Sequence, residues 1–269
     1  MTKVVVAGGA GRMGRRVMYM VAQHPDLRLV GGFEQPGNPE IGKDLGDLAG
    51  IDKLGVSLSA GLAGVIAQAD VIIDFTFHES TMQFARLAAE HKKAMVIGTT
   101  GLGPDNLAEL RTLAANFPCV QSPNMAVGVN VLFKVARKVA AILGDDYDIE
   151  IVEAHHRMKK DAPSGTALKL GEMVAAGVNR DLAKVGVFAR HGIIGARTNQ
   201  EIGIQTIRAG DIVGEHTVYF AGAGERLEIT HRAHSRDNFA KGAALAAAWV
   251  ASQDNGLYSM FDVLGLQDF

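Results

Sequence analysis

The chain has 269 residues and a formal net charge of −2. This length fits two modest domains, and the near balance of charge argues against the basic surface of a nucleic-acid partner. The single cysteine, Cys119, excludes an intramolecular disulfide framework and a multi-cysteine metal site, which favours a reducing, cytoplasmic location.

The amino-terminal residues lead directly into a strand. Lys3–Ala7 is apolar and ends at glycines, and no charged leader with an apolar stretch precedes it, so we expect no signal peptide. The longest apolar run near the end, Ala243 to Ala251, is far shorter than the roughly 20 residues that span a membrane. We therefore expect no membrane partner.

The first half of the chain has a β-α-β order. Lys3–Ala7 is followed by helical spacing over Arg12–Gln23 and by a second apolar run over Leu27–Phe33. Further strand-like runs alternate with helix-like segments: Val71–Phe75, Ser80–His91, Ala94–Ile97, Asp105–Ala115 and Cys119–Gln121. This alternation predicts an α/β fold, a Rossmann-like doubly wound parallel sheet. Between these elements, the Gly-, Pro- and Asp-rich segment Gln35–Gly55 predicts an exposed loop.

Glycines at positions 8, 11 and 14 stand where the first strand gives way to the first helix. The spacing differs from a strict G-x-G-x-x-G, and a lone glycine pattern is weak. The position of the glycines between a strand and a helix makes the evidence for a dinucleotide site stronger. Glycine lets the backbone turn tightly and approach a pyrophosphate at the helix N-terminus. We predict a dinucleotide site here, with a ligand-free glycine-rich turn as the alternative.

Glu34 ends the second strand, 20 residues after Gly14. A carboxylate there accepts hydrogen bonds from ribose hydroxyls and repels a 2′-phosphate. Gln35 supplies no compensating cation, which leaves nearby cationic side chains to do so: Arg12, Arg15, Arg16 or Lys43. The sequence therefore predicts NADH as the preferred cofactor, with NADPH tolerated.

Threonines follow two later strands, in Asp74-Phe-Thr76 and Gly98-Thr-Thr-Gly101. The carboxyl edge of an open α/β sheet is where ligands bind, so these hydroxyls are candidates for contacting the nicotinamide ribose or amide. The alternative is that Thr76 and Thr99 only cap the next helix or turn.

The alternation of strand-like and helix-like segments breaks near Ser122–Gly128. One helix-like stretch, Val129–Leu143, leads into a strand-rich region with a hairpin turn at Gly222–Gly224. The expected strands are Ile149–Ala154, Lys184–Ala189, Ile202–Arg208, His216–Ala221 and Arg226–His231. This predicts a second, α+β domain over residues 127–235 with an open mixed sheet. Residues 1–126 would form the dinucleotide-binding domain, completed by a helix over Asp237–Ser252 within 236–269.

Two histidines, a lysine pair and a helix start converge in Glu153–Ala167. Histidine titrates near neutral pH, and a helix N-terminus offers N–H groups to an anion. Ser164 is a candidate N-cap for a helix over Ala167–Ala176, so that Gly165 and Thr166 could hold a carboxylate. Six histidines in this domain also raise metal binding, but no metal motif spacing is present and the lysines Lys159 and Lys160 would repel a cation, so we predict no metal.

Taken together, these segments resemble the bacterial 4-hydroxy-tetrahydrodipicolinate (dihydrodipicolinate) reductases of lysine and diaminopimelate biosynthesis. The resemblance covers the whole chain and is carried by the following segments: Gly8–Gly14, Gly98–Gly101, Glu153–Arg157, Lys159, Asp161–Thr166 and Arg208–His216. The histidine-lysine segment is specific to that family, whereas many dehydrogenases share the glycine loop.

The resemblance implies an oxidoreductase that transfers a hydride from NAD(P)H to a cyclic imine dicarboxylate, with loss of water. It implies that His155 and Lys159 are catalytic proton donors, and that His156, Gly165 and Thr166 bind substrate. It assigns cofactor contacts to Gly8, Gly9, Ala10, Gly11, Arg12, Met13, Glu34, Gly98, Thr99, Thr100, Ser122, Pro123, Asn124 and Met125. It further implies a homotetramer assembled through the second domain, and closure of the two domains on substrate. Gln35 departs from the arginine that many members carry, which argues against high NADPH affinity.

Two other functions remain compatible with parts of the sequence. An NAD-dependent dehydrogenase of another small oxo or amino acid would keep the glycine loop without needing the His-His-x-x-Lys cluster. A dinucleotide sensor would also have no need of the His-His-x-x-Lys cluster, and one that binds DNA would carry a basic recognition domain that this chain lacks.

Overall fold

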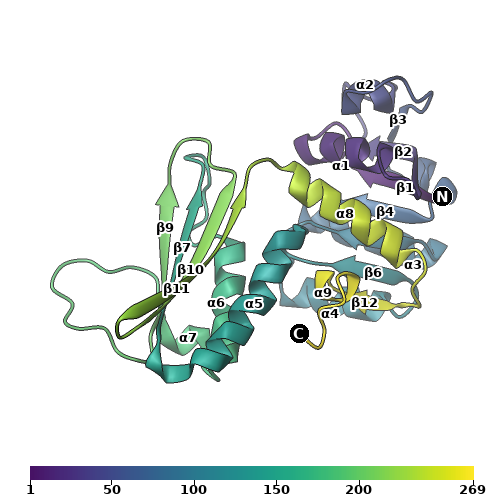
Figure 1. Cartoon of the computed structure of the whole chain (residues 1–269). Coiled ribbons are helices and arrows are strands. Elements are labelled where there is room, and N and C mark those ends of the chain that lie inside the picture. Colours follow the sequence, from purple (N-terminus) through teal and green to yellow (C-terminus); the bar gives the residue numbers. More distant parts are fainter. The chain divides into compact units, whose positions relative to one another are not determined.

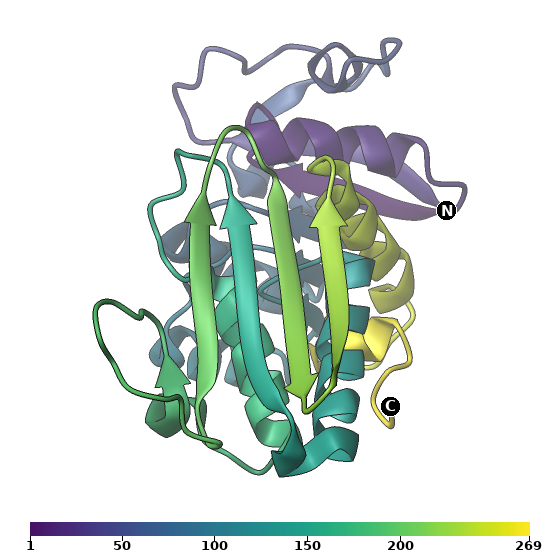
Figure 2. The ribbon, with the colours of Figure 1, turned by 60° about the vertical axis from the view of Figure 1, so that its left-hand side comes forward.

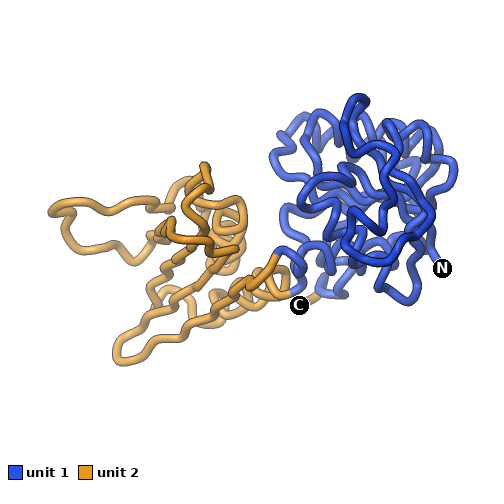
Figure 3. The backbone as a smooth tube through the Cα atoms, turned by 90° about the horizontal axis from the view of Figure 1, so that it is seen from above, with its two compact units in different colours: residues 1–127, 236–267 blue, residues 128–235, 268–269 orange.

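A computed structural model describes all residues from Met1 to Phe269 (Figure 1). The chain divides into two compact units (Figure 3). Unit 1 comprises Met1–Val127 and Arg236–Gln267, and unit 2 comprises Gly128–Ser235 with Asp268–Phe269. None of the helices is long and apolar enough to cross a membrane.

Unit 1 contains a seven-stranded sheet in the order β12-β6-β5-β4-β1-β2-β3, in which every paired strand is parallel to its neighbour. Its strands are β1 (Thr2–Ala7), β2 (Leu27–Glu34), β3 (Leu58–Ala60), β4 (Val71–Asp74), β5 (Ala94–Ile97), β6 (Pro118–Gln121) and β12 (Gly256–Tyr258). Its helices are α1 (Arg12–Ala22), α2 (Leu45–Ala49), α3 (His78–His91), α4 (Pro104–Leu113), α8 (Asp237–Val250) and α9 (Met260–Val263), with short 3-10 turns at Leu62–Gly64 and Ile66–Gln68.

Helices cover both faces of this sheet, because successive strand residues point to opposite sides and both sides are apolar. Val4 and Val6 face a core formed with α1 and α8, whereas Val5 and Ala7 face a second core formed with α3 and α4. The predicted doubly wound parallel sheet is confirmed. The late helix α8 packs beside α1, as expected of a carboxyl-terminal segment that completes this unit.

Several short elements, among them α2 and β12, were missed because turn-forming residues hide a brief apolar signal. Within the predicted loop Gln35–Gly55, α2 buries Leu45 and Leu48, so this part of the loop prediction is wrong. Asp44 starts that helix by accepting a hydrogen bond from the Gly46 backbone N–H at 2.8 Å. The strand β12, only three residues long, adds to the sheet edge beside β6.

Unit 2 contains a five-stranded mixed sheet in the order β11-β10-β7-β9-β8. Its elements are α5 (Val127–Leu143), β7 (Asp148–His155), α6 (Gly165–Gly177), α7 (Leu182–Val185), β8 (Gly186–Val187), β9 (Ile202–Arg208), β10 (Gly214–Gly222) and β11 (Glu225–Ala233), with a 3-10 turn at Gly144–Asp146. The predicted turn joins β10 to β11. The predicted strand Lys184–Ala189 is largely wrong, because Asp181 caps a helical turn over its first residues and only Gly186–Val187 pairs with β9.

One face of the unit 2 sheet is apolar and the other is open. Ile149, Ile151, Val218 and Phe220 are fully buried on the covered side, and α6 packs there against β7 and β9. The strands β9, β7, β10 and β11 lie side by side across the open face in Figure 2. The connection from β7 to α6 is the segment that carries the histidine-lysine cluster.

Candidate functional site

The first half of the candidate site lies at the carboxyl edge of the unit 1 sheet. β1 and β4 are neighbours, and the strand order runs away from this pair in both directions. Such a reversal opens a crevice between the loops that follow the two strands, and open α/β sheets bind ligands there. The predicted segments after β1, β5 and β6 all lie at this edge, because the strands are parallel.

The glycine loop after β1 is shaped by a close backbone approach. Gly8 has a positive φ of 63°, and a Cβ added at Gly14 would lie 2.0 Å from the Gly8 carbonyl oxygen. Only glycine therefore lets α1 start this near the end of β1. Gly11 is the N-cap of α1, and the first turn contains no acidic residue. The loop and the positive end of the helix fit a pyrophosphate.

Glu34 lies beside this loop, at the end of β2. Its Oε1 accepts a hydrogen bond from the Ala10 backbone N–H at 3.1 Å. The side chain is thereby held next to the residues predicted to contact the dinucleotide. A carboxylate in this place suits ribose hydroxyls and repels a 2′-phosphate.

Three of the four cationic side chains that could compensate a 2′-phosphate are engaged by other groups. Arg15 donates from Nε to the Ala10 carbonyl at 2.9 Å and pairs with Glu40 at 3.4 Å. Lys43 pairs with the same Glu40 carboxylate at 3.1 Å. Arg16 binds Asp237 through two hydrogen bonds of 2.6 and 2.8 Å. Arg12, in contrast, is exposed in the first turn of α1.

A buried acid that the sequence analysis did not assign joins two loops of this edge. Asp74, at the end of β4, is 0% exposed and accepts hydrogen bonds from the hydroxyls of Thr76, Thr81 and Thr99. Burial raises the pKa of Asp74, because no cation compensates for the lost water. The sequence feature that could have revealed Asp74 is an acidic residue directly after the apolar run Val71–Ile73.

The threonine hydroxyl of Thr99 therefore has a structural partner. It donates to Asp74 at 3.1 Å and accepts the Thr76 backbone N–H at 2.9 Å, and the residue is 3% exposed. Of the two alternatives, contact with a nicotinamide or local structure, the geometry favours local structure for this hydroxyl. Gly98 leaves room for the Phe75 ring, and Thr100 is exposed.

The segment after β6 is also internally bonded. The Ser122 hydroxyl donates to the Asn124 carbonyl at 2.9 Å, and the Ala126 backbone N–H donates to the Asn124 Oδ1 at 2.9 Å. Met125 is 1% exposed and packs in the core. Its predicted cofactor contact is thus restricted to the backbone, whereas Pro123 is exposed at the surface.

The second half of the candidate site lies in unit 2, where β7 ends and α6 begins. His155 is the last residue of β7, and its Nδ1 lies 2.6 Å from the Glu153 Oε2. An ionised carboxylate only accepts hydrogen bonds, so Nδ1 carries the proton and Nε2 is the nitrogen that exchanges protons. A Cβ at Gly214 would lie 3.1 Å from Nε2, so glycine keeps the space beside this nitrogen free.

His156 and Lys159 lie in the tight turn after β7. The Lys159 backbone N–H donates to the His156 carbonyl at 3.1 Å, which fixes the turn. The Lys159 ammonium pairs with the Asp161 carboxylate at 2.9 Å, and that pairing helps to hold the pKa of Asp161 below its usual value against the opposing effect of burial. The structure thus places both predicted proton donors, His155 and Lys159, in one connection of the chain.

Ser164 starts α6 as predicted, with its hydroxyl accepting the Ala167 backbone N–H at 3.1 Å. Gly165 is the first helical residue, where a backbone N–H has no acceptor within the helix. A Cβ added at Gly165 would meet nothing within 4 Å, so the space in front of this helix start is open. These features fit a carboxylate of the substrate.

His216 lies on β10, and its ring contacts that of His155. The two rings meet edge to face, with centroids 5.2 Å apart, and His216 Nε2 lies 3.2 Å from the Ser164 hydroxyl. Burial lowers the pKa of His216 to about 3, and the neighbouring His155 acts in the same direction. His216 is therefore neutral at physiological pH. The burial of His216 could have been predicted from the sequence, because this histidine alternates along the strand with Val218 and Phe220.

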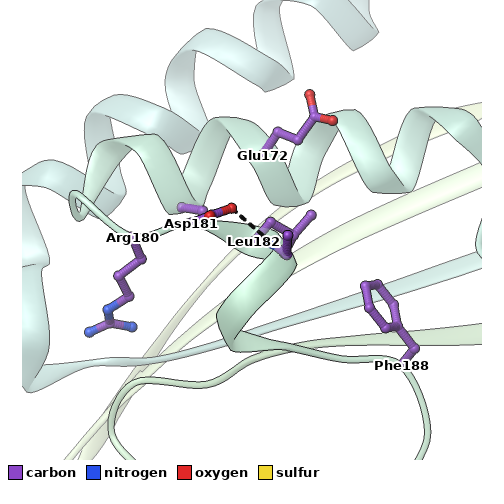
Figure 4. A pocket seen from close by; sticks show the side chains of 7 residues that line it. Glu172, Arg180, Asp181, Leu182 and Phe188 are labelled. Atoms are coloured by element: carbon purple, nitrogen blue, oxygen red, sulfur yellow. Dashed lines mark hydrogen bonds between the residues drawn. The ribbon is translucent and has the colours of Figure 1, made fainter. Parts of the chain in front are cut away.

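Unit 2 also has a hollow of about 360 Å³ between α6, α7 and the start of the following loop (Figure 4). It is lined by Glu172, Ala175, Arg180, Asp181, Leu182, Ala183 and Phe188. None of the predicted site residues lines this hollow. Arg180 binds Asp145 and the Gln200 carbonyl, which leaves it little freedom to receive a ligand.

Comparison with known proteins gives the same assignment for both units. The family model described as dihydrodipicolinate reductase, N-terminus, matches residues 2–125, and the one described as dihydrodipicolinate reductase, C-terminus, matches residues 128–264. A protein of Desulfotalea psychrophila named 4-hydroxy-tetrahydrodipicolinate reductase is 69% identical over the full length of both chains. A protein of the same name from Syntrophus aciditrophicus is 54% identical over 99% of this chain and all of its own.

A solved structure has the same fold over nearly the whole chain. The dipicolinate-bound dihydrodipicolinate reductase from a Paenisporosarcina species matches with a TM-score of 0.77 and 26% identity, covering 97% of this chain and 98% of the other. An amine dehydrogenase from Mycobacterium smegmatis matches with a TM-score of 0.58 and 16% identity over 96% and 95% of the two chains, which indicates a shared fold.

The buried, neutral His216 predicts a specific pH dependence of stability. In the unfolded chain this imidazole titrates near its ordinary pKa of about 6.5, whereas in the folded chain it does so at about 3. The unfolded state therefore binds more protons between these values, and stability is present above pH 6.5 and is lost as the pH falls. Between pH 7 and pH 5, His216→Gln should remove about 2 kcal/mol of the pH dependence of the unfolding free energy, measured by urea denaturation.

The control is His191→Gln, which replaces an exposed histidine of the same unit and should retain the pH dependence of the unchanged chain. An identical pH dependence in His216→Gln and the unchanged chain would mean that His216 is not held neutral.

Proposed function

The chain belongs to the dihydrodipicolinate reductase family, and we propose that its two half-sites act together to reduce 4-hydroxy-tetrahydrodipicolinate to tetrahydrodipicolinate with NADH. In this proposal unit 1 binds the dinucleotide and unit 2 binds the dicarboxylate substrate. The reaction belongs to the lysine and diaminopimelate pathway that the family serves.

One observation in unit 2 supports the catalytic part most strongly. A histidine with one ring nitrogen committed to a carboxylate, a lysine and an open helix N-terminus all lie in the connection from β7 to α6. A dianionic substrate suits these cations and N–H groups, and a proton donor is then adjacent to the bound carboxylates. The roles of His156, Gly165 and Thr166 as substrate contacts are part of this proposal.

The chemistry requires one hydride and one proton, with loss of water. When bound, NADH supplies the hydride, which carries two electrons to the carbon conjugated with the imine. Electron density then accumulates on the substrate at an enamine-like position, where an acid must deliver a proton. We assign that delivery to Nε2 of His155. The Lys159 ammonium is the second proton donor, to the hydroxyl that leaves as water, and the ring C–H lost in the same elimination gives a proton back, so that one proton is consumed overall. The glycine loop and Glu34 fit the dinucleotide, with no Cβ at Gly14 to obstruct the close approach of α1.

We expect His155→Ala and Lys159→Ala each to lower kcat by about 10²- to 10⁴-fold, the range contributed by a general acid. The dissociation constant for NADH should stay unchanged, because these residues lie in unit 2. Turnover is followed as NADH oxidation with substrate generated from pyruvate and aspartate semialdehyde by the preceding synthase. NADH binding is followed by fluorescence.

Lys169→Ala is the matched control, since it removes a lysine of α6 that pairs with Glu172 at 3.1 Å outside the proposed site. It should retain full activity. Normal turnover in both the His155 and Lys159 variants would contradict the assignment, and so would the absence of substrate-dependent NADH oxidation by the unchanged chain.

We propose that NADH is preferred and NADPH tolerated. Glu34 disfavours a 2′-phosphate, and Glu40 ties up both Lys43 and Arg15, which would otherwise attract one. Glu40→Gln should therefore raise kcat/KM for NADPH a few-fold while leaving that for NADH unchanged, because solvent-exposed ion pairs are weak. Initial rates with both cofactors measure the ratio.

The control for this variant is Asp47→Asn, which weakens a 4.0 Å pair with Lys53 and should change neither value. A strong preference of the unchanged chain for NADPH would refute the cofactor proposal.

We propose a homotetramer assembled through the open sheet face of unit 2. Thr217 and Thr230 pair across β10 and β11 on that face through their hydroxyls at 3.0 Å, and Ile207 of β9 is 46% exposed. The nine-residue strand β11 lies at one edge of this sheet, and a long exposed edge is a template for pairing with another chain. Light scattering should give the mass of a tetramer, and Thr217→Arg should lower it by placing a charge in the interface. A monomeric mass for the unchanged chain would contradict the proposal.

We also propose that the enzyme works in the cytoplasm, where its dinucleotide cofactor is found. The one cysteine, Cys119, is buried, and burial raises the pKa of its thiol, so the protein makes no use of an oxidising compartment. Cell fractionation that recovers the protein outside the cytoplasm would contradict this location.

A further inference from the structure

A single carboxylate in unit 2 contacts both the proton donor and the start of the helix that faces the substrate. Glu153, two residues before His155 on β7, is 0% exposed. Its Oε2 accepts from His155 Nδ1 at 2.6 Å, and its Oε1 accepts from the Ser164 backbone N–H at 3.0 Å. Arg208 on β9 donates to both oxygens at 2.9 Å, and the Thr206 hydroxyl adds a contact of 3.2 Å.

We infer that Glu153 is a positioning residue for the reduction, and that it sets both the proton-bearing nitrogen of His155 and the placement of the α6 N-terminus, with Arg208 holding it in place. This inference rests on the proposed function. Glu153 contacts no substrate atom in this scheme, and it acts through His155 and Ser164.

The contact with His155 decides which nitrogen works as the acid. Every group around the carboxylate is a donor, so the carboxylate accepts throughout and His155 must present Nδ1–H to it. After Nε2 gives up its proton, the remaining proton is already hydrogen-bonded at Nδ1. A carboxylate that orients a histidine through its other nitrogen is a recurrent device for fixing tautomer and ring direction.

The contact with Ser164 places the carboxylate cradle. The Ser164 backbone N–H precedes the first helical residue, Gly165, so its bond to Glu153 fixes where the open helix N-terminus lies. The same Oε1 and Oε2 thus set the distance between the substrate carboxylate and the proton donor. A general acid must lie within hydrogen-bond reach of the atom that it protonates, and shifts of about 1 Å are costly.

Arg208 also connects Glu153 to the turn that carries Lys159. Besides both oxygens of Glu153, it donates to the Asp161 carbonyl at 2.6 Å, and Asp161 pairs with Lys159. Burial alone would raise the pKa of Glu153, but the hydrogen bonds from His155 and Arg208 hold it well below its usual value. The carboxylate is therefore ionised throughout the working pH range.

The same strand offers a matched comparison that lacks any connection to the site. Glu150, also on β7, is bound by Arg190 through two hydrogen bonds of 2.9 and 2.7 Å. Its alternation with Glu153 and Ile151 places it on the open face of the sheet, and no predicted site residue contacts it. A merely structural arginine-carboxylate pair should behave as this one does.

The decisive variant is Glu153→Gln, which keeps the shape and removes one acceptor. Its NH₂ group must face a donor on one side. Arg208 donates on both sides, so it loses one hydrogen bond whichever way the amide turns. The other donors on the Oε1 side cannot reverse, whereas on the Oε2 side His155 can accept if its proton moves to Nε2. We therefore expect the His155 tautomer to switch, read from ¹⁵N shifts of labelled histidine, with the signal assigned by His155→Gln.

The kinetic expectation follows from the same geometry. Because the Ser164 N–H keeps its acceptor in Glu153→Gln, KM for the substrate should stay within about twofold. The value of kcat should fall about 10- to 100-fold, as when a carboxylate that orients a metal-binding histidine is removed. Glu150→Gln should alter neither kcat nor the His155 signal. Equal effects of the two glutamine substitutions, or an unchanged tautomer with full kcat in Glu153→Gln, would overturn the inference.

Arg208→Lys covers the case in which Glu153→Gln does not fold. It keeps the positive charge but loses the bidentate grip, so kcat should fall several-fold, while Arg190→Lys at the comparison pair leaves it unchanged. Equal kcat in these two lysine variants would also overturn the inference. The tautomer measurement needs no turnover, so it tests this inference separately from the proposed function. Failure of the proposed function would show as a lack of activity in the unchanged chain.

Discussion

Each unit of this protein is organised around an acidic side chain that the fold removes from water and that must find partners there. In unit 2 the buried acid is Glu153, satisfied by a guanidinium, an imidazole, a backbone N–H and a hydroxyl. In unit 1 it is Asp74, satisfied by threonine hydroxyls and the Thr76 backbone N–H. In both units some of those partners lie in the segments that carry the candidate site, so satisfying the acid also shapes the site.

The two acids differ in charge balance, and their pKa values move in opposite directions. Cationic partners lower the pKa of Glu153, whereas burial among neutral partners raises that of Asp74. An acid that is firmly ionised can polarise and orient a histidine, which suits a site where protons move. An acid bonded only to hydroxyls and backbone groups fixes loop geometry, which suits a site where a nucleotide is held between strand ends.

The doubly wound sheet was predictable from the sequence because buried parallel strands are short apolar runs and the helices between them have a clear period. The exceptions are informative. α2 is five residues long and lies among Gly and Asp, so its apolar pair Leu45 and Leu48 is too brief to stand out. β12 has three residues and depends on β6 for its pairing, a contact between segments more than a hundred positions apart.

The candidate site was predictable where its residues are close in sequence. His155, Lys159 and Gly165 belong to one connection, so a local pattern reveals them, and the glycine loop is likewise local. The partners of these residues were not predictable, because Arg208 reaches Glu153 from β9, and His216 reaches Ser164 and the His155 ring from β10, through strand pairing. The same holds for Thr99, for which the sequence left nicotinamide contact and a local structural role as alternatives, and whose hydroxyl bonds to Asp74.

The sequence by itself determined the class of fold and the family and indicated the candidate catalytic groups, because periodicity, glycine spacing and a dense motif are properties of neighbours along the chain. Only the tertiary structure decided which nitrogen of His155 carries the proton, which cations near Glu34 are already paired, and which acids are buried. Those properties depend on distance and on access to water, and both are set when strands and loops far apart in sequence pack together.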